Sequence, residues 1–187
     1  MHRKIISLTL VFLFTLTLAG CGNKYRVEKE GMPEQLRTQL EGQIKKGKEM
    51  LAAAADDLAA KTKALHEIAF ASEQLGYYDK AIPLYKEILD IDPKHFPALN
   101  NLGVIYEEVK EFETSAKYYG RLLEANPSNT EALSDAIRVL LAAGLFESAQ
   151  TNLENFARYN QDAGEDLSGF ISDQFELIRD ARAGSEE

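Results

Sequence analysis

From residue 34 onward, apolar residues return every three to four positions along the chain, which is the period of one face of an α-helix. No stretch shows the strict apolar and polar alternation that is typical of a half-buried strand. The pattern therefore predicts an all-α protein. Residues 33–60 carry one such stripe, made by Leu36, Leu40, Ile44, Leu51, Ala55 and Leu58.

The middle of the chain also repeats itself every 34 residues. Pro93 and Pro127 are one period apart, and several apolar positions recur with the same spacing. The equivalent sets are Leu65, Leu99 and Leu133; Tyr78, Phe112 and Phe146; and Tyr85, Tyr119 and Leu153. The period divides this part of the chain into three units, 62–95, 96–129 and 130–163.

A helix-turn-helix period of 34 residues with these residue types resembles the tetratricopeptide repeat (TPR) family. The resemblance implies a right-handed helical solenoid of about three repeats, in which the small residues Ala69 and Gly103 lie where paired helices approach closely. Gly76 and Gly144 follow first helices, where a left-handed turn favours glycine. Departures from the family pattern occur at Lys110, which replaces a turn glycine, and at Ile137 and Gln161.

The two ends of the repeat array are expected to be covered, because stacked repeats leave an apolar face at each end. In residues 164–187, a helix expected from about Glu165 to Ala183 resembles the capping helix of the family and precedes a short tail. Residues 34–61 leave two interpretations open. Gly42 lies 34 residues before Gly76, which fits a degenerate fourth repeat, but one long or bent helix would tolerate Gly42 and Gly47 at about 1 kcal/mol each.

The first 21 residues have the organisation of an export signal. Arg3 and Lys4 precede an apolar run that is shorter than the about 20 residues a membrane-spanning helix needs. The run ends in Leu18-Ala19-Gly20-Cys21, which resembles the lipobox of bacterial lipoproteins. The resemblance implies a signal peptide at 1–20 and acylation of Cys21 by fatty acids such as palmitate. The alternatives are an ordinary secreted protein with an unrelated cysteine, or an uncleaved anchor.

Lipidation would anchor the mature protein at the cell envelope. Gly22 follows the cysteine where many Gram-negative inner-membrane lipoproteins have Asp, so the resemblance favours the outer membrane, facing the periplasm, in a Gram-negative cell. Residues 21–33 contain the lipidated N-terminus and then charged residues without a repeating apolar face. We expect them to form a flexible tether that reaches roughly 40 Å when fully extended.

The charge balance limits the kinds of partner. Cleavage before Cys21 would remove Arg3 and Lys4 from the 21 basic residues and none of the 30 acidic ones, which leaves a net charge of −11. Such a balance argues against nucleic acid, because binding to nucleic acid relies on Lys and Arg that neutralise phosphates. No second cysteine is present for a disulfide.

Motifs for catalysis are missing from the pattern. The segment from His66 to Phe70 begins like a zinc-protease helix, but Phe70 occupies the place of the second histidine. No serine lies in a Gly-x-Ser-x-Gly elbow, and no Gly-rich phosphate loop occurs. We therefore expect no enzyme activity, no metal and no cofactor; an enzyme with an unrecognised site is the third-ranked interpretation.

The remaining candidate is a binding groove, because first helices of successive repeats line a concave surface in the TPR family. Asn101 matches a position that often holds a peptide backbone through its amide, which both donates and accepts hydrogen bonds. The family's carboxylate clamp is interrupted by Phe70, Val104 and Asp135. Carried over in register, the groove residues are Lys63, His66, Glu67, Phe70, Gln74, Asn100, Asn101, Val104, Glu107, Glu108, Glu131, Ser134, Asp135 and Arg138.

Together these observations predict a membrane-anchored lipoprotein whose repeat groove binds an extended or helical protein segment with an apolar anchor and some basic character. Its task would be scaffolding or assembly of an envelope complex, such as pilus, secretion, outer-membrane or cell-wall machinery. The alternative is a structural lipoprotein that associates with copies of itself, as a homo-oligomer without a dedicated peptide ligand.

Overall fold

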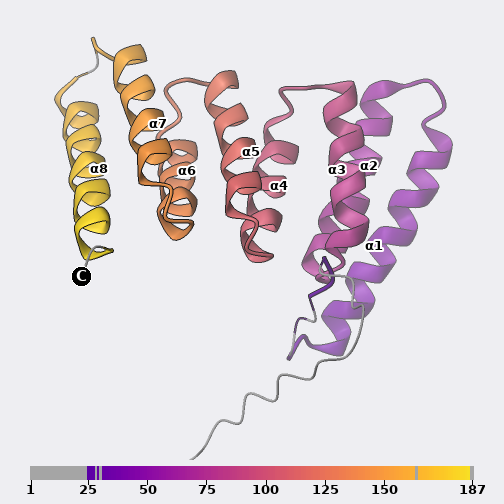
Figure 1. The fold of residues 1–187 in the computed structure, drawn as a ribbon. Coiled ribbons are helices and arrows are strands. Elements are labelled where there is room, and N and C mark those ends of the chain that lie inside the picture. The colour runs from indigo at the N-terminus through magenta and orange to yellow at the C-terminus, as the bar shows by residue number, and fades with distance from the viewer. Residues whose placement is uncertain (1–24, 28, 30, 163, 186–187) are drawn as a thin grey trace, which may run out of the picture.

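The computed structural model describes residues 25–27, 29, 31–162 and 164–185. The expected signal peptide and Cys21 lie outside the described residues, so both remain predictions. The described chain is helical apart from turns and one isolated backbone bridge (Figure 1). Its helices are α1 (Glu34–Ala53), α2 (Leu58–Gln74), α3 (Tyr78–Ile91), α4 (Phe96–Glu108), α5 (Phe112–Ala125), α6 (Thr130–Ala142), α7 (Phe146–Tyr159) and α8 (Glu165–Gly184).

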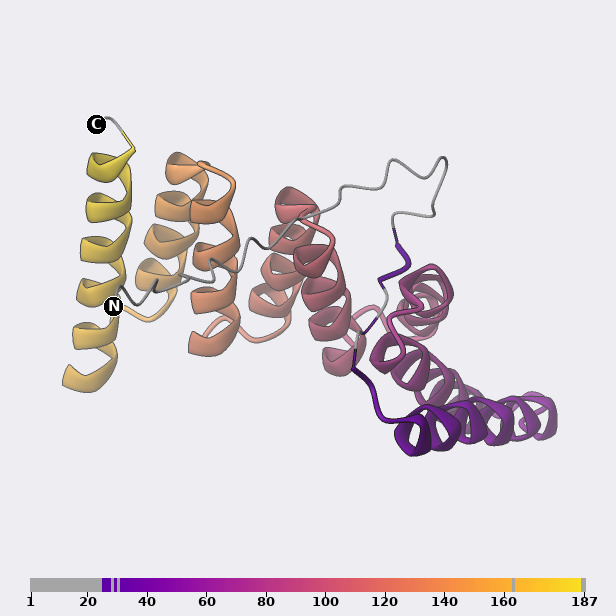
Figure 2. The same cartoon turned by 90° about the horizontal axis from the view of Figure 1, so that it is seen from below.

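The helices stack in chain order, and each packs against the next from α1 to α8. The turns within the pairs α2–α3, α4–α5 and α6–α7 lie along one edge of the array, which we call the turn edge (Figure 1). The loops that lead from one pair to the next lie along the opposite edge, the loop edge. Figure 2 shows the pairs following one another in a row. This is the all-α solenoid that the 34-residue period predicted.

Residues with positive φ close the three turns of the turn edge. Gly76 and Gly144 have φ of 75° and 71°, which a residue without a Cβ adopts easily. Lys110 holds φ of 61° at the equivalent place, so the turn keeps its shape although the glycine is missing. Pro83 lies inside α3 without ending the helix.

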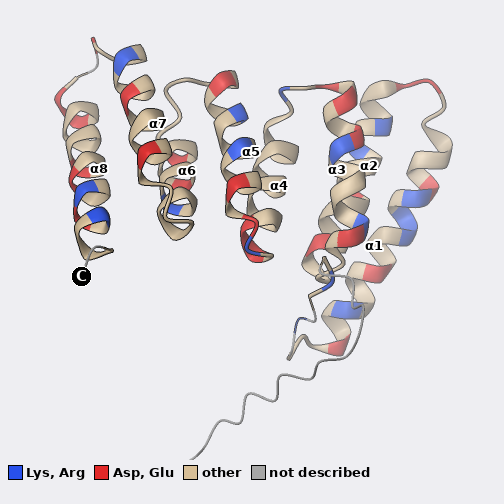
Figure 3. Cartoon of the chain, in the orientation of Figure 1, with Lys and Arg blue, Asp and Glu red and all other residues tan. Residues whose placement is uncertain are grey.

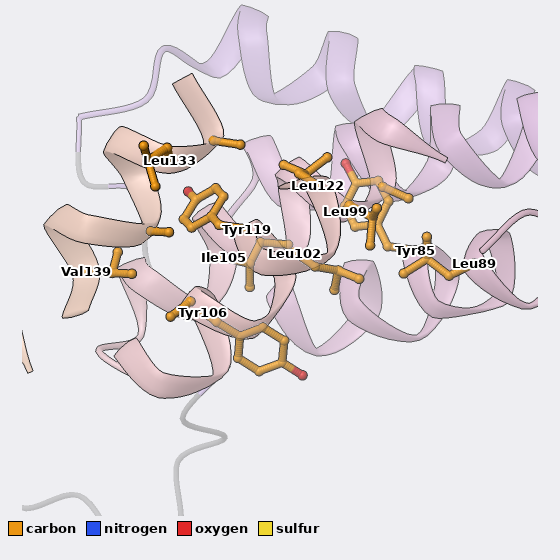
Figure 4. Close-up of a cluster of buried hydrophobic side chains, with 14 of the residues drawn as sticks. Tyr85, Leu89, Leu99, Leu102, Ile105, Tyr106, Tyr119, Leu122, Leu133 and Val139 are labelled. Carbon is orange, nitrogen blue, oxygen red and sulfur yellow. The ribbon is translucent and has the colours of Figure 1, made fainter. Parts of the chain in front are cut away.

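Small residues let the paired helices approach closely. A Cβ added to Gly103 on α4 would lie 2.7 Å from the ring of Tyr119 on α5, so only glycine leaves room for that ring. On the same pair, the hydroxyl of Ser115 donates a 2.7 Å hydrogen bond to the carbonyl of Gly103. Tyr119 belongs to the continuous core of leucines, isoleucines and tyrosines between the helix layers (Figure 4).

Residues 34–53 form one helix, which decides between the two interpretations of this segment. α1 runs without a break through Gly42 and Gly47. Gly47 is buried against α2, where an added Cβ would lie 2.6 Å from Ile68 Cγ1. Gly47 therefore allows close helix packing. Gly42, where a fourth repeat would need its turn, lies inside the same unbroken helix.

α8 covers the far end of the array. Its inward residues Leu167, Phe170 and Ile171 pack against the core, and Ile178 belongs to that core. The ring of Phe170 meets Phe156 of α7 edge to face, with centroids 6.3 Å apart. α8 contacts both α6 and α7, which is the arrangement expected of a capping helix.

The expectation of a flexible tether is wrong for Tyr25–Val27, which are docked on the solenoid. The Val27 N–H donates to the Gly76 carbonyl at 2.9 Å, and the Asp79 N–H donates to the Tyr25 carbonyl at 2.9 Å. The guanidinium of Arg26 lies 4.4 Å from the centre of the Tyr77 ring. Backbone pairing and aromatic contacts, which leave no apolar period in the sequence, therefore hold this short stretch.

Candidate binding groove

The expected groove residues lie on α2, α4 and α6, the first helices of the three pairs. Several of them fall into a cluster around His66, a hydrogen-bonded network at Asn101, and an ion-pair group at Arg138. Acidic residues are spread over all the helices (Figure 3), and the groove shares this character through Glu67, Glu107, Glu131 and Asp135.

An aromatic cluster surrounds His66 on α2. The imidazole stacks on Phe70, one helical turn along, with centroids 6.2 Å apart and an interplanar angle of 7°. Tyr85 and His95 lie 6.0 and 6.1 Å away. Phe70 itself is 43% exposed, so its ring is accessible on the surface of α2.

A pocket of about 470 Å³ opens beside this cluster, between the first turns of α2 and the junction of α3 with α4. Lys63, His66 and Glu67, which the sequence placed in the groove, line it together. The sequence reasoning missed its other walls: Leu58, Ala59, Thr62, Ile91, Asp92, His95 and Pro97. His95 could have been found from the sequence, because it lies two residues before Pro97, at the place of a residue that caps a helix. In the structure its Nδ1 caps α4 by accepting from the Ala98 N–H at 3.2 Å.

The protonation of His66 follows from its surroundings. Burial, and then the charge of nearby His95, lower the pKa of His66 below its ordinary value. The ring is therefore neutral at pH 7. Its Nε2 is buried and has no hydrogen-bond partner in the described chain.

A chain of hydrogen bonds joins the groove to the core. Asn101 Nδ2 on α4 donates to the hydroxyl of Tyr85 at 2.7 Å, and that hydroxyl donates to Glu73 Oε2 at 2.7 Å. Burial raises the pKa of Glu73, and burial together with the adjacent carboxylate raises that of Tyr85. One N–H of Asn101 is thus used internally, which differs from the expectation of a free amide. Its Oδ1 makes no bond in the described structure and can accept from a peptide.

Arg138 gathers the carboxylates between α4 and α6. Its guanidinium bonds Glu107 on α4 and, at 2.7 Å, Asp135 on its own helix. Burial, and then the neighbouring Glu131, raise the pKa of Asp135. This part of the groove is therefore closed by an internal ion-pair group.

Glu108 does not join the groove cluster. Its carboxylate lies 4.0 Å from Lys29 Nζ, beside the docked N-terminal stretch at the turn edge. Asn100, Val104 and Ser134 are half-buried, and Gln74 and Glu131 are exposed. Among the described residues, no three His, Cys, Asp or Glu side chains converge as metal ligands. In the same part of the chain, no helix is both long and apolar enough to cross a bilayer.

Family models recognise the repeat in part of the chain. One tetratricopeptide repeat model matches residues 62–95 and another matches 84–116. The chain is 29% identical over 76 residues to the BBSome complex member BBS4 of Bos taurus, which covers 41% of this chain and 15% of that protein. It is 37% identical over 59 residues to the uncharacterized protein ycf37 of Pyropia yezoensis, covering 32% and 33%. The chain thus spans at most a third of these relatives.

Solved structures agree with the fold. A tetratricopeptide repeat protein from Parabacteroides merdae superimposes with a TM-score of 0.56 at 18% identity, over 88% of this chain and 62% of that one. A MamA double mutant gives a TM-score of 0.55 at 15% identity, over 80% and 88%. Likeness at this identity concerns the fold alone. Residues 62–116 therefore carry recognised tetratricopeptide repeats, within a helical solenoid of the tetratricopeptide type.

Proposed function

We propose that this chain is a lipoprotein, anchored at the cell envelope through acylated Cys21, whose groove captures a segment of another protein. It would act as a scaffold or assembly factor for an envelope complex. The observation that carries the groove proposal is the pocket beside His66, which has apolar walls and lies next to the exposed ring of Phe70, stacked on His66.

The pocket suits an apolar side chain as the anchor of the bound segment. Leu58, Ile91 and Pro97 offer apolar contact, and Phe70 extends it toward the middle of the groove. Large side chains that fill such pockets usually dominate the energy of a protein interface. Beyond the pocket, Asn101 Oδ1 offers an acceptor to a main-chain N–H.

The charges favour a segment with some basic character. Glu67 lies at the pocket, and Glu131 is exposed at the opposite end of the groove. Glu107 and Asp135 are already balanced by Arg138, so they would contribute little. Complementary charge at the rim of an interface mainly speeds association and selects partners.

A single substitution tests the groove. The full-length protein, cross-linked in cells, should lose its bound envelope protein when Phe70 is changed to Ala. Phe175→Ala is the matched control, because Phe175 is 38% exposed on α8, away from the groove. Equal capture by both variants would overturn the groove proposal. Self-association, the alternative, would appear as a cross-linked species containing only this chain.

The lipid anchor is tested separately. A labelled fatty acid should enter the full-length protein made in bacteria, and Cys21→Ser should abolish the label. Incorporation that persists in Cys21→Ser, or that is missing from the unaltered protein, would contradict anchoring through this residue.

A further inference from the structure

The docked stretch Tyr25–Val27 lies at the turn edge, at the lower ends of α2 and α3 in Figure 1. Besides its backbone bonds to Gly76 and Asp79, it reaches the next repeat through Tyr25, whose hydroxyl donates to Glu111 at 2.9 Å. The stretch thus spans the turns of two successive helix pairs. We call this attachment the clip.

The backbone of the clip lies so close to Gly76 that no side chain would fit there. A Cβ added to Gly76 would lie 1.8 Å from the Val27 carbonyl oxygen, far inside contact distance. Gly144 occupies the equivalent turn with nearly the same φ, and an added Cβ there would meet nothing within 4 Å. The turn conformation explains a glycine at both positions, but the close backbone approach is peculiar to Gly76.

The clip shortens the connection to Cys21. From Cys21 to Tyr25 the fully extended chain spans at most about 14 Å, whereas from Cys21 to Glu34 it would span at most about 45 Å. An anchor at Cys21 would therefore keep the turn edge close to the bilayer while the clip is formed. The loop edge would lie about 20 Å farther away, since α3 has 14 residues at 1.5 Å each.

The clip and the first turn of α1 carry groups that can contact a phospholipid surface. Arg26, Lys29 and Arg37 line one pocket of about 270 Å³ between the clip and α1. Leu36, in the first turn of α1, is 42% exposed. Lys29 and Arg37 also lie near carboxylates, 4.0 Å from Glu108 and 3.9 Å from Glu34, at partly exposed sites where a headgroup phosphate can compete. Cations of this kind beside an exposed leucine are found on surfaces that touch headgroups.

From these observations we infer that the turn edge faces the bilayer and that the clip sets this orientation, leaving the loop edge toward the aqueous side. The inference rests on the proposed anchor at Cys21. It assigns a membrane-contacting surface to the clip and the start of α1, in addition to the partner groove.

Energy transfer to the membrane tests the orientation. The acylated full-length protein would be placed in vesicles of phosphatidylethanolamine and phosphatidylglycerol that carry an acceptor lipid. A donor dye would be attached at Glu113→Cys on the turn edge or at Lys94→Cys on the loop edge, both exposed positions. Transfer should be stronger from position 113. Equal or reversed transfer in acylated protein would overturn the inference.

Variants of the clip give the matched controls. Gly76→Ala should remove the difference between the two dye positions, and Gly144→Ala should keep it, although both place a Cβ at positive φ. Val27→Pro removes the N–H that bonds Gly76 without altering the solenoid, so it should act like Gly76→Ala even if that variant folds poorly. A difference that survives Val27→Pro would show that the clip does not set the orientation.

Two further readouts separate failure of the inference from failure of the anchor. The mass of the N-terminal peptide reports acylation; an unmodified Cys21 would overturn the anchor and, with it, the orientation. Hydrogen exchange at the Val27 amide measures how often the clip opens, whether or not Cys21 is acylated. It should be at least about tenfold faster in Gly76→Ala than in Gly144→Ala. Equal exchange would overturn the clip while the anchor stands.

Discussion

The side-chain amide of Asn101 on α4 donates a 2.7 Å hydrogen bond to the hydroxyl of Tyr85 on α3, which joins a groove residue to the buried core. The Tyr85 hydroxyl in turn donates to Glu73, so three side chains from three helices are linked. A substitution of any of these three hydrogen-bonded side chains is therefore expected to affect folding as well as binding.

Asn101→Ala should weaken partner capture and also lower the free energy of unfolding by about 0.5–1.5 kcal/mol, the usual net worth of one hydrogen bond. Urea unfolding followed by circular dichroism measures the second effect. Asn100→Ala is the control, since Asn100 has the same side chain on the same helix without the bond to Tyr85. Identical unfolding midpoints for the two variants would contradict this role.

The buried carboxyl of Glu73 should make stability depend on pH. Its pKa is raised in the folded state, so folding favours the protonated form. This contribution is present below the ordinary glutamate pKa of about 4.3 and is lost as pH rises through the raised value. Glu73→Gln can still accept from Tyr85 but carries no charge. Its stability relative to the unaltered protein should increase as the pH rises above about 4.3 and level off above the raised pKa of Glu73.

Glu67→Gln provides the comparison for that experiment, because Glu67 is exposed on the same helix. Thermal melting across the pH range would be recorded for all three proteins. Melting curves of Glu73→Gln and the unaltered protein that stay parallel with pH would rule out a folded-state shift at Glu73.

Gly103 and Gly120 offer a matched pair on the facing helices α4 and α5. A Cβ at Gly103 would press on Tyr119, so Gly103→Ala should destabilise the fold by about 1–3 kcal/mol through overpacking. A Cβ at Gly120 would meet nothing within 4 Å, so Gly120→Ala should instead stabilise by up to about 1 kcal/mol through helix propensity. Urea unfolding gives both values, and changes of the same sign would refute the packing argument.

The sequence predicted the helix pairs well because their signal is local and repeated. Leu65, Leu99 and Leu133 recur every 34 residues, and all three are fully buried in the structure. Their spacing reflects helix packing within each repeat, so a residue pattern alone was enough to place the units and the turns at Gly76 and Gly144.

The clip and the hydrogen bonds that link Asn101, Tyr85 and Glu73 leave no such pattern in the sequence. Val27 pairs with Gly76 through backbone atoms, which every residue has, so nothing in the residue types marked the contact. Tyr85 was recognised as a core position by its spacing from Tyr119, but the period does not tell where its hydroxyl points. Its bonds to Glu73 and Asn101 depend on how three helices meet in space.

Lys110 is the non-glycine residue that closes the α4–α5 turn, at φ of 61°. A side chain in this left-handed region costs about 1–2 kcal/mol, and part of the gain from glycine is offset by the greater freedom of the unfolded chain. Lys110→Gly should therefore stabilise the fold by about 0.5–1 kcal/mol. Lys110→Ala removes the same charge but keeps the Cβ, so its unfolding midpoint should stay near that of the unaltered protein. Equal gains from Lys110→Gly and Lys110→Ala would mean that charge, and not backbone conformation, limits stability at this turn.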